Sequence, residues 1–421
     1  MILSKELLKG GSKTVFAGLD IGTSKIAVVI GEGAVSGGLN ILGVGMSRSR
    51  GLRQGVVINL DQAVQSIQKA MHAAQLTAGA EVRDVIVGIA GDHVRGVNSK
   101  GVVGIAGPDH EIGKHDVERV IDAAKAIALP FDREVLHVLP QEFVVDNQHG
   151  IKNAVGMTGV RLEAEVHIVT GAVTSAQNIV RCVKKAGLRV TGLVLEPLAS
   201  SYAVLDQNEK EMGAALIDIG EGTTDLAIFY DGAIRYTGVV GLAGRNVTND
   251  IAVGLRTPIE KAEEIKIKHG CAHRDAVDEV IPFQVASMGG RDSREFMQED
   301  LVDIIQPRME EIFSLVAKEI KNCEYGQSLA AGITLTGGGA LLKGTELLAE
   351  EVFGIPAKLG IPMGISGLVE TVESPMTATG VGLLKYHMEK GDIPSHDYGE
   401  DEAGMFTKVY QWMKSIVEDF I

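Results

Sequence analysis

The chain has 421 residues and carries 40 Lys and Arg against 55 Asp and Glu, a formal net charge of −15. At about 100–200 residues per domain, this length predicts two to four structural units. The acidic balance argues against nucleic acid as a main partner, because phosphate backbones attract clustered Lys and Arg. Three cysteines far apart in the sequence give no disulfide framework, and no apolar run reaches the ~18 residues of a transmembrane helix. We therefore expect a folded cytoplasmic protein.

Strand-like and helix-like segments alternate along the chain, which favours an α/β architecture. Two strands are predicted at 15–19 and 26–30, on either side of a tight loop. A helix follows, with apolar residues at helical spacing at Leu60, Val64, Ile67, Met71 and Ala74. Further on, the pattern predicts a strand in EVRDVIVGIAG, a helix ending near Pro130, a helix over 172–187 and a long helix from Leu301.

One pattern occurs twice. Residues 16–30, FAGLDIGTSKIAVVI, resemble residues 214–229, AALIDIGEGTTDLAIF. Each copy is an apolar strand, then Asp-Ile-Gly, then a turn of small residues, then a second apolar strand. Asp20 and Asp218 are separated by about half the chain, so the repeat predicts a duplicated domain with pseudo-two-fold symmetry.

Both copies have the residue types of a phosphate-binding loop. Phosphate oxygens are bound by converging backbone N–H groups, and small residues let the backbone approach them closely. Asp20 and Asp218, at the strand ends, are placed to hold Mg²⁺ through its water molecules. The alternative is a pair of ordinary tight turns, in which Asp-x-Gly is common. The predicted loop residues are Gly22, Thr23, Ser24 and Lys25 in the first copy and Gly220, Glu221, Gly222, Thr223 and Thr224 in the second.

A third glycine-rich element follows in ITLTGGGALLKGTELLAEEVFG, residues 333–354. A predicted strand leads into Gly337, Gly338 and Gly339 and then into a helix, which would let the backbone approach a base or ribose. No G-x-x-x-x-G-K-[ST] and no G-x-G-x-x-G after a strand occurs, so neither a P-loop nor a Rossmann site is predicted.

The order of these three elements resembles the superfamily of actin, heat-shock chaperones and sugar kinases. Three stretches narrow the resemblance to the bacterial cell-division family FtsA: RDVIVGIAGDHVRGVNSKGVVGI at 83–105, HVLPQEFVVDNQHGIKNAVGMTGVRLEAEVHIVTG at 137–171 and SMGGRDSREFMQEDLVDIIQPR at 287–308. The resemblance covers essentially the whole chain. It implies an α/β, actin-like fold: a duplicated ribonuclease H-like core of two domains and four subdomains, with the insertion typical of FtsA.

The resemblance also implies subdomain limits, ligands and further site residues. ATP and Mg²⁺ are the implied ligands, with at most slow hydrolysis, because no residue presents itself as a base for a sugar hydroxyl. Glu263 and Lys266, in KAEEIK, resemble the ribose-contacting helix, although Glu263 also fits a solvated helix face. Glu196 resembles the acid that orders Mg²⁺-bound water. The implied limits are 1–83 and 162–211 for subdomain 1A, 84–161 for the 1C insertion, 212–243 and 327–390 for 2A, 244–326 for 2B, 391–404 for a linker and 405–421 for a terminal helix.

The end of the chain differs from the rest. Residues 391–404, GDIPSHDYGEDEAG, carry five acidic residues and no Lys or Arg, which predicts a flexible linker. Residues 405–421, MFTKVYQWMKSIVEDFI, have a broad apolar stripe at helical period, which favours a helix lying in a membrane interface. The alternative is a helix docked on the body of the protein. The predicted membrane-facing residues are Phe406, Val409, Tyr410, Trp412, Met413, Ile416, Val417 and Phe420.

The resemblance finally implies partners. In the FtsA family the terminal helix is a membrane anchor, and subdomain 2B receives the acidic C-terminal tail of the tubulin-like ring protein FtsZ. Arg291 and Arg294 are candidates for that contact. We therefore expect an ATP-binding protein that polymerises, tethers the FtsZ ring to the cytoplasmic membrane at the septum and recruits later division proteins. The alternatives are another actin-fold scaffold, of the rod-shape or pilus-assembly type, or a small-molecule kinase.

Overall fold

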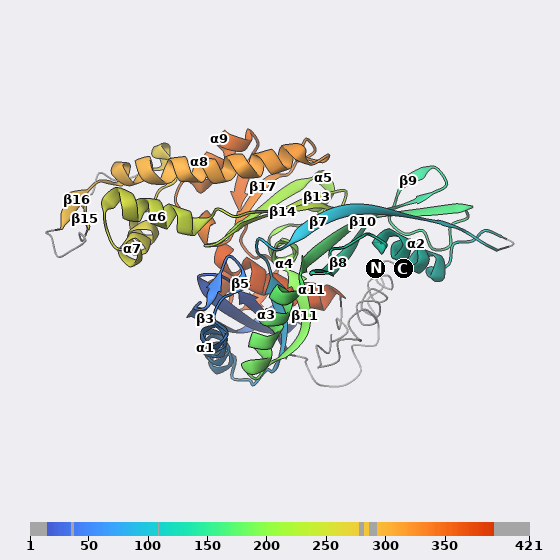
Figure 1. Ribbon diagram of the computed structural model, residues 1–421, viewed down its shortest axis with the longest axis horizontal. Coiled ribbons are helices and arrows are strands. Elements are labelled where there is room, and N and C mark those ends of the chain that lie inside the picture. Colours follow the sequence, from blue (N-terminus) through green and yellow to red (C-terminus); the bar gives the residue numbers. More distant parts are fainter. Residues whose placement is uncertain (1–14, 35–37, 108, 278–281, 286–292, 391–421) are drawn as a thin grey trace.

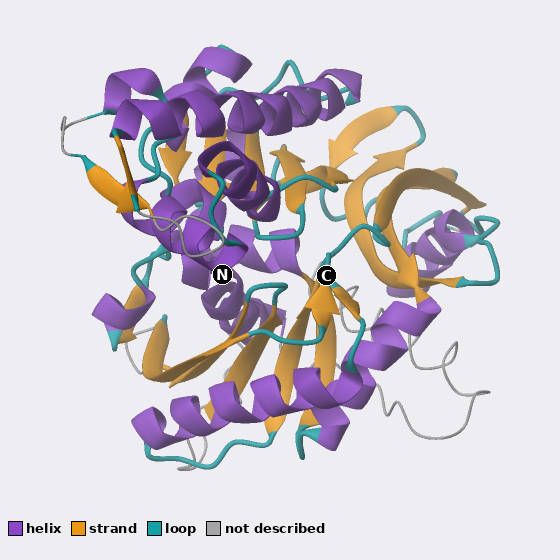
Figure 2. Ribbon diagram, turned by 60° about the vertical axis from the view of Figure 1, so that its left-hand side comes forward, coloured by secondary structure: helices purple, strands orange, loops and turns teal. Residues whose placement is uncertain are grey.

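The computed structural model describes residues 15–34, 38–107, 109–277, 282–285 and 293–390. The molecule is elongated, and two large sheets lie near its centre (Figure 1). A third sheet, inserted in the first half of the chain, lies at one end. A helical group with a small hairpin lies at the other end. Figure 2 shows helices on the outer sides of the two large sheets and also between them.

The first-half sheet has six strands in the order β11-β6-β1-β2-β3-β19. β1 pairs antiparallel with β2 and parallel with β6, so the two apolar strands predicted around the first loop form a hairpin at the centre of the sheet. The sheet consists of β1 (Val15–Ile21), β2 (Lys25–Gly33), β3 (Leu39–Arg48), β6 (Asp84–Ile89), β11 (Arg189–Leu195) and β19 (Ile365–Gly367).

The second-half sheet repeats the first. Its order is β14-β13-β12-β17-β18, and β12 again pairs antiparallel with the strand after it and parallel with the strand on its other side. Five strands of the first sheet, from β3 to β11, match the five strands of the second in order, as a duplicated fold requires, and β19 has no counterpart. Its strands are β12 (Ala214–Ile219), β13 (Thr224–Tyr230), β14 (Ala233–Val240), β17 (Gly332–Thr336) and β18 (Ala357–Leu359).

The insertion forms a four-stranded antiparallel sheet in the order β7-β10-β8-β9, with α2 (Lys114–Lys125) packed on β7 and β10. The last strand of the insertion, β10, leads directly into α3, which packs with the first large sheet. The subdomain limits expected from the sequence stay a prediction. The strands are β7 (Arg95–Gly104), β8 (Arg133–Val145), β9 (Gln148–Ile151) and β10 (Arg161–Ala172).

Helices cover the two large sheets. α1 (Leu60–Ala78) and α3 (Val173–Lys185) pack with the first sheet, while α4 (Glu196–Val204) and α11 (Ala378–Lys390) pack against each other. In the second half, α6 (Gly244–Leu255), α7 (Ile259–His269), α8 (Gln298–Asn322) and α9 (Thr345–Phe353) form the helical layer. The shorter elements are β4 (Leu52–Arg53), β5 (Val56–Val57), α5 (Gln207–Met212), β15 (Phe283–Val285), β16 (Arg294–Phe296), α10 (Val369–Val372), η1 (Arg274–Ala276), η3 (Gly338–Leu341) and η4 (Pro375–Thr377).

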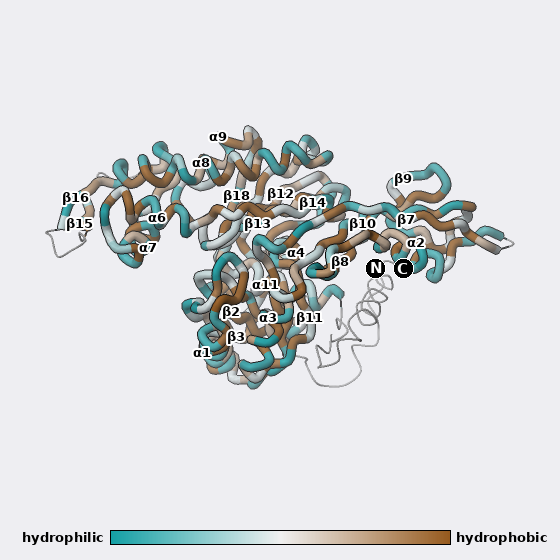
Figure 3. The backbone as a smooth tube through the Cα atoms, in the orientation of Figure 1, coloured by the Kyte–Doolittle hydropathy of each residue, from teal (hydrophilic) through white to brown (hydrophobic). Residues whose placement is uncertain are grey.

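The apolar residues of the strands form the cores. In Figure 3 the hydrophobic segments gather in the sheets, and the outer turns of the helices are mostly hydrophilic. α1 shows how the periodicity works: Asn59 caps its first turn, and Ala63, Ile67, Ala70, Met71 and Ala74 are buried against the sheet. The helical spacing read from the sequence is therefore confirmed for this element.

Glycine allows helices to lie unusually close to strands and to other helices. On β3, a Cβ built at Gly45 would lie 2.0 Å from the Ala70 carbonyl oxygen of α1. On α11, a Cβ at Gly382 would lie 2.0 Å from the Ala199 carbonyl oxygen of α4. Both distances are far below van der Waals contact, so many of the 52 glycines serve packing rather than ligand binding.

We expect Gly45→Ala to destabilise the fold by at least about 1–3 kcal/mol, because the added methyl group forces α1 away from β3. Gly104→Ala is the matched control: it also lies in a strand, but nothing lies within 4 Å of its Cβ position. Urea unfolding should place this control within about 0.5 kcal/mol of wild type. Equal stability of the two variants would contradict the packing argument.

Candidate functional site

A cavity of about 770 Å³ opens between the two halves. Both repeated loops, the start of α4, the α6–α7 segment and the Gly337 turn border it. It brings together residues that the sequence analysis selected from five separate segments. Of the predicted site residues, the ones that line it are Asp20, Gly22, Thr23, Ser24, Lys25, Glu196, Asp218, Gly220, Glu221, Glu263, Lys266, Gly337, Gly338 and Gly339.

The two repeated loops have the same local geometry. A Cβ at Gly22 would lie 3.0 Å from the Lys25 carbonyl oxygen, and one at Gly220 would lie 3.1 Å from the Thr223 carbonyl oxygen. In the second loop, the Gly220 N–H also donates to that carbonyl oxygen at 3.0 Å. The repeat in the sequence is therefore a repeat in conformation, with one tight turn in each half.

Three predicted loop residues do not line the cavity. The Thr223 hydroxyl donates to Asp225 Oδ2 at 2.9 Å, and the Thr224 hydroxyl donates to the Leu242 carbonyl oxygen at 2.8 Å. Gly222 instead lets the halves touch, because a Cβ there would lie 2.9 Å from Thr23 Oγ1 and 3.0 Å from Gln54 Cα. These three residues shape and position the second loop.

Asp20 and Lys25 form an ion pair at the floor of the cavity. Lys25 Nζ lies 2.8 Å from Asp20 Oδ2, and Asp20 is only 4% exposed. Burial alone would lower the pKa of Lys25, but Asp20, Asp218 and Glu196 together raise it. Lys25 therefore carries a full positive charge at neutral pH.

Carboxylates outnumber this lysine. Burial, with the Asp20 charge, raises the pKa of Asp218 to about 6, although the Ser200 hydroxyl donates to it. Burial, with the Asp218 charge, raises the pKa of Asp225 to about 7. Burial and the three aspartates raise the pKa of Glu196 well above its ordinary value. Such a set of acids favours a bound cation.

The sequence analysis did not select Asp225, although the comparison of the two repeats pointed to it. It is the second residue of β13 and lies directly opposite Asp218 in the hairpin register. The first copy of the repeat has Ala27 at the corresponding place, opposite Asp20. Comparing the two copies position by position would have selected Asp225, together with Glu221, as an acid present only in the second copy.

The carboxylates of Asp20 and Asp218 suit an Mg²⁺ ion that is bound through water molecules. Within the described part of the chain, no three His, Cys, Asp or Glu side chains lie close enough to bind a metal ion by themselves. Mg²⁺ commonly keeps several waters and takes one or two carboxylates together with substrate phosphates. Asp20 and Asp218, one from each half, supply carboxylates of that kind.

The glycine triplet has two structural roles. Gly337 has φ of 82°, and a Cβ there would lie 2.4 Å from Asp218 Oδ1. A Cβ at Gly339 would lie 2.3 Å from Ile219 Cγ2. Only Gly338 has open space, with its nearest atom, in Met376, 3.9 Å from the Cβ position. Packing against the end of β12 thus explains two of the glycines, and the third offers its backbone to the cavity.

Glu263 and Lys266 form one polar cluster on α7. Lys266 Nζ lies 2.8 Å from Glu263 Oε2 and donates to Thr248 Oγ1 at 2.8 Å and to the Gly244 carbonyl oxygen at 3.1 Å. Both residues line the cavity. They are therefore anchored to the start of α6 rather than lying on a free solvated face.

Other cavity residues have no motif that would reveal them. They come mainly from the end of β3, the start of α6, α7 and the turns near η4, where the sequence contains neither a repeat nor a glycine-rich motif. Gly244 approaches the second loop, since its N–H donates to the Gly220 carbonyl oxygen at 3.1 Å. Arg245 pairs with Glu221 at 2.6 Å. The lining residues not selected beforehand include Arg48, Ser49, Gly244, Arg245, Met309, Leu342, Met376 and Thr379.

Known proteins share both the sequence and the fold. The family model described as "Cell division protein FtsA" matches residues 215–382, and the model "SHS2 domain inserted in FTSA" matches residues 91–170. FtsA of Pseudomonas aeruginosa is 46% identical over 96% of this chain and 98% of its own length. FtsA of Escherichia coli K12 is 39% identical over 97% and 98%, respectively.

The chain belongs to the FtsA family of cell-division proteins. Among solved structures, the PilM–PilN type IV pilus biogenesis complex matches with a TM-score of 0.64 at 18% identity, over 88% of this chain and 98% of that one. MreB5 of Spiroplasma citri bound to ADP matches with a TM-score of 0.55 at 15% identity, over 90% and 99%. The predicted actin-like fold with the FtsA insertion is thereby confirmed.

The remaining predicted residues divide into described and undescribed ones. Arg294, on β16, donates to the Leu255 carbonyl oxygen at the end of α6, and its guanidinium lies 5.2 Å from the centre of the Phe296 ring. Arg291, the linker 391–404 and the terminal segment 405–421 lie outside the described residues. Among the residues that are described, no helix is long and apolar enough to span a bilayer.

In metal-free buffer, we expect Asp218→Asn to stabilise the protein at pH 8 by about 1–3 kcal/mol. The raised pKa of Asp218, about 6, means that its ionised form costs folding free energy above that pH. The gain should shrink as the pH falls below about 6 and should be small at pH 4, where the folded carboxyl is protonated and the unfolded one is about half protonated.

Urea unfolding between pH 4 and pH 8 measures this gain. The control is Glu264→Gln, because the hydrogen bond from Lys261 lowers the pKa of the exposed Glu264. That variant should gain no stability at pH 8. If Asp218→Asn were no more stable than wild type at pH 8, the ionised Asp218 carboxylate would not cost folding free energy.

Proposed function

We propose that this FtsA-family protein binds Mg-ATP in the cleft and uses it to control assembly on the cytoplasmic membrane, where it tethers the FtsZ ring. The observation that carries the proposal is the pair of matched loops facing one cavity, with buried carboxylates from both halves around a single lysine. Backbone N–H groups of small residues and a cation between two carboxylates suit a polyphosphate. Hydrolysis, if it occurs, would be slow and would act as a switch.

The parts of the cleft can be assigned to parts of the ligand. The loops at Gly22–Lys25 and Gly220–Glu221 would hold the phosphates, with Mg²⁺ between Asp20 and Asp218. Glu263 and Lys266 would contact the ribose, and the backbone at Gly338 would approach the base. Bound Mg²⁺ would neutralise part of the carboxylate charge and leave Glu196 placed to order a water molecule.

Membrane attachment is assigned to the segment 405–421. One amphipathic helix binds a bilayer weakly and reversibly, but many helices on one polymer bind tightly through effective concentration. Polymerisation of the actin-like body would therefore switch attachment on, bringing the protein to the cytoplasmic face of the membrane at the septum. Later division proteins would be recruited to that polymer.

Liposome co-sedimentation tests the tether. We expect the full chain to pellet with vesicles, more strongly with Mg-ATP, and a chain truncated after Gly404 to stay in solution. On a helical projection, Met413 and Gln411 lie on opposite sides, so Met413→Glu should abolish pelleting and Gln411→Glu should not. If the full chain stays in solution under all conditions, the terminal segment is a docked helix and the tether is refuted.

FtsZ binding is assigned to the end of the molecule that carries β15 and β16. Arg294 is exposed, and its contacts with Leu255 and Phe296 fix the guanidinium at the surface of this subdomain. A guanidinium held in this way keeps further N–H donors for a carboxylate and loses little side-chain entropy on binding. An acidic peptide tail is the partner that this chemistry suits.

We expect charge reversal at both Arg291 and Arg294 to weaken binding of an FtsZ C-terminal peptide by at least about tenfold, because charge-assisted hydrogen bonds are lost. Fluorescence anisotropy with a labelled peptide measures this loss. Arg274→Glu is the control, since Arg274 is exposed on the same half and pairs with Asp303. Unchanged affinity in the double variant would remove the assignment.

A further inference from the structure

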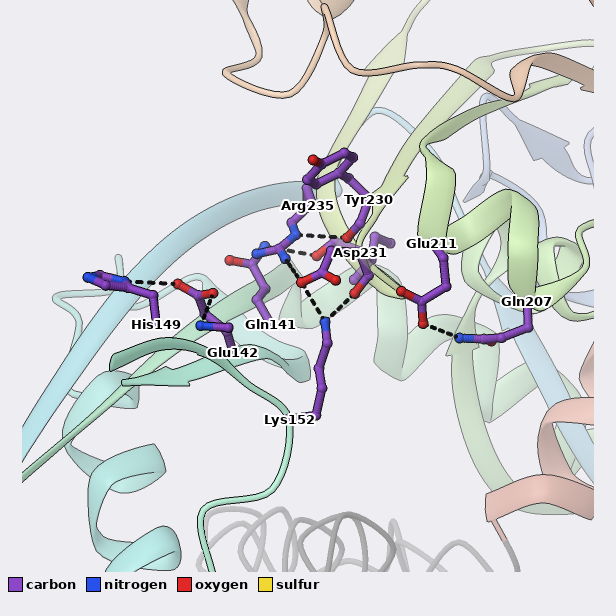
Figure 4. Close-up of polar contacts among 11 residues, drawn as sticks. Gln141, Glu142, His149, Lys152, Gln207, Glu211, Tyr230, Asp231 and Arg235 are labelled. Atoms are coloured by element: carbon purple, nitrogen blue, oxygen red, sulfur yellow. Dashed lines mark hydrogen bonds and ion pairs between the residues drawn. The ribbon is translucent and has the colours of Figure 1, made fainter. Parts of the chain in front are cut away.

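Side chains of the inserted domain form a polar contact with the second half of the molecule (Figure 4). The contact lies at the turn end of the β13–β14 hairpin, and the second phosphate loop lies at the opposite end of the same hairpin. We call this contact the latch. It comprises Asn98, Gln141, Lys152 and His167 on the insertion side and Asp231, Ile234, Arg235 and Thr237 on the hairpin side.

β14 is the edge strand of its sheet, and amide side chains of the insertion bind its free backbone. Gln141 Nε2 donates to the Ile234 carbonyl oxygen at 2.8 Å, in a buried setting. Asn98 Nδ2 donates to the Arg235 carbonyl oxygen at 3.1 Å. The register of β14 shifts at Arg235, and such a bulge re-aims the backbone of an edge strand. The hairpin thus has a local irregularity where the insertion binds it.

His167 completes the buried part of the latch. Burial lowers its pKa to about 4, so the ring is neutral at physiological pH. Its Nδ1 lies 2.6 Å from Asn98 Oδ1, and its Nε2 lies 2.9 Å from Thr237 Oγ1. Because an amide oxygen only accepts, Nδ1 carries the proton and Nε2 accepts from the threonine hydroxyl. A Cβ at Gly96 would lie 2.3 Å from Thr237 Oγ1, so the two sides meet closely.

An ion pair closes the latch at the surface. Lys152 Nζ lies 2.7 Å from Asp231 Oδ2, with side chains 43% and 39% exposed. The same carboxylate accepts from the buried guanidinium of Arg235 at 3.3 Å. In Figure 4, Lys152 points from the insertion towards Asp231 at the hairpin turn. Removing Lys152 therefore opens the latch at its accessible end without creating a cavity.

The β13–β14 hairpin links the latch to the cleft. Thr224 and Asp225, the first residues of β13, follow the second phosphate loop, while Asp231 forms the turn at the far end. Seven residues of strand span about 23 Å. A paired antiparallel hairpin within a five-stranded sheet moves as a unit, so a displacement of the loop also displaces the turn.

We propose that the latch couples the insertion to the nucleotide site, so that closure of the cleft on Mg-nucleotide tightens the contact between the inserted sheet and β14. This inference rests on the proposed nucleotide binding. It adds that nucleotide binding changes the structure at a second, distant contact. The Asp20 charge of the first half contributes to the raised pKa of Asp218 in the second, because the two carboxylates repel each other across the cleft. The latch holds the halves together against that repulsion, and a bound cation removes it.

Nucleotide affinity is the first test. Lys152→Glu places two like charges at the latch, and Thr237→Val removes the hydroxyl at nearly constant volume. Because coupling between sites is reciprocal, each should weaken Mg-ATP binding by about fivefold in titration calorimetry on the full chain. Lys100→Glu is the matched control: Lys100 pairs with Glu165 inside the inserted sheet and should leave affinity unchanged. Equal affinity of Lys152→Glu, Thr237→Val and wild type would overturn the latch.

Hydrogen exchange gives a second readout that separates the two proposals. In wild type, Mg-ATP should slow amide exchange in residues 95–104 and 233–240, and Lys152→Glu should lose that response while still binding nucleotide. Binding without any change in these two segments would overturn the latch and leave the proposed function standing. Absence of Mg-ATP binding to the wild-type protein would remove the proposed function and the latch with it.

Discussion

Three buried acids around one lysine, with a fourth acid beside Asp218, constrain the rest of this molecule. Asp20 comes from the first half, Asp218 and Asp225 come from the second, and Glu196 lies between them at the start of α4. Burying like charges costs free energy that hydrogen bonds offset only in part. The raised pKa values of Asp218 and Asp225 express that cost. Contacts outside the cleft must therefore help to hold the two halves together, and a bound cation of the kind we propose would reduce this cost.

The duplicated fold supplies the symmetry that this arrangement needs. Each half places an aspartate near the end of a central strand, and a tight turn follows it. Close packing then fixes the strands, because Gly45 and Gly382 let α1 and α4 approach to distances that no Cβ would allow. The same residue type thus serves the loops and the scaffold. A stability defect and a ligand-binding defect can consequently look alike in glycine variants, and unfolding measurements must accompany binding ones.

The sequence was informative wherever a pattern repeats and uninformative wherever contacts join distant segments. The two Asp-Ile-Gly hairpins, the helical spacing of α1 and the order of the glycine-rich elements predicted the α/β duplication and 11 of the 29 residues that line the cavity. Gly222, Thr223 and Thr224 were expected at the cavity, but their partners are Gln54, Asp225 and Leu242, and no local pattern encodes those contacts. Arg48 and Met309 reach the cavity only because of tertiary packing. The latch could likewise not be predicted from the sequence, because Asn98, Gln141 and His167 belong to three strands of ordinary composition.

The last described helix connects the cleft to the terminal segment. α11 starts beside the cavity, where Thr379 lines it and its hydroxyl lies 3.1 Å from that of Ser200, which in turn donates to Asp218. It then runs about 20 Å, packed against α4, and ends at Lys390, one residue before the acidic linker. Truncation after Gly404 removes none of the residues of α11 or of the cavity lining. A truncated protein that still binds nucleotide but no longer pellets with vesicles would therefore report on the terminal segment, and not on damage to the cleft.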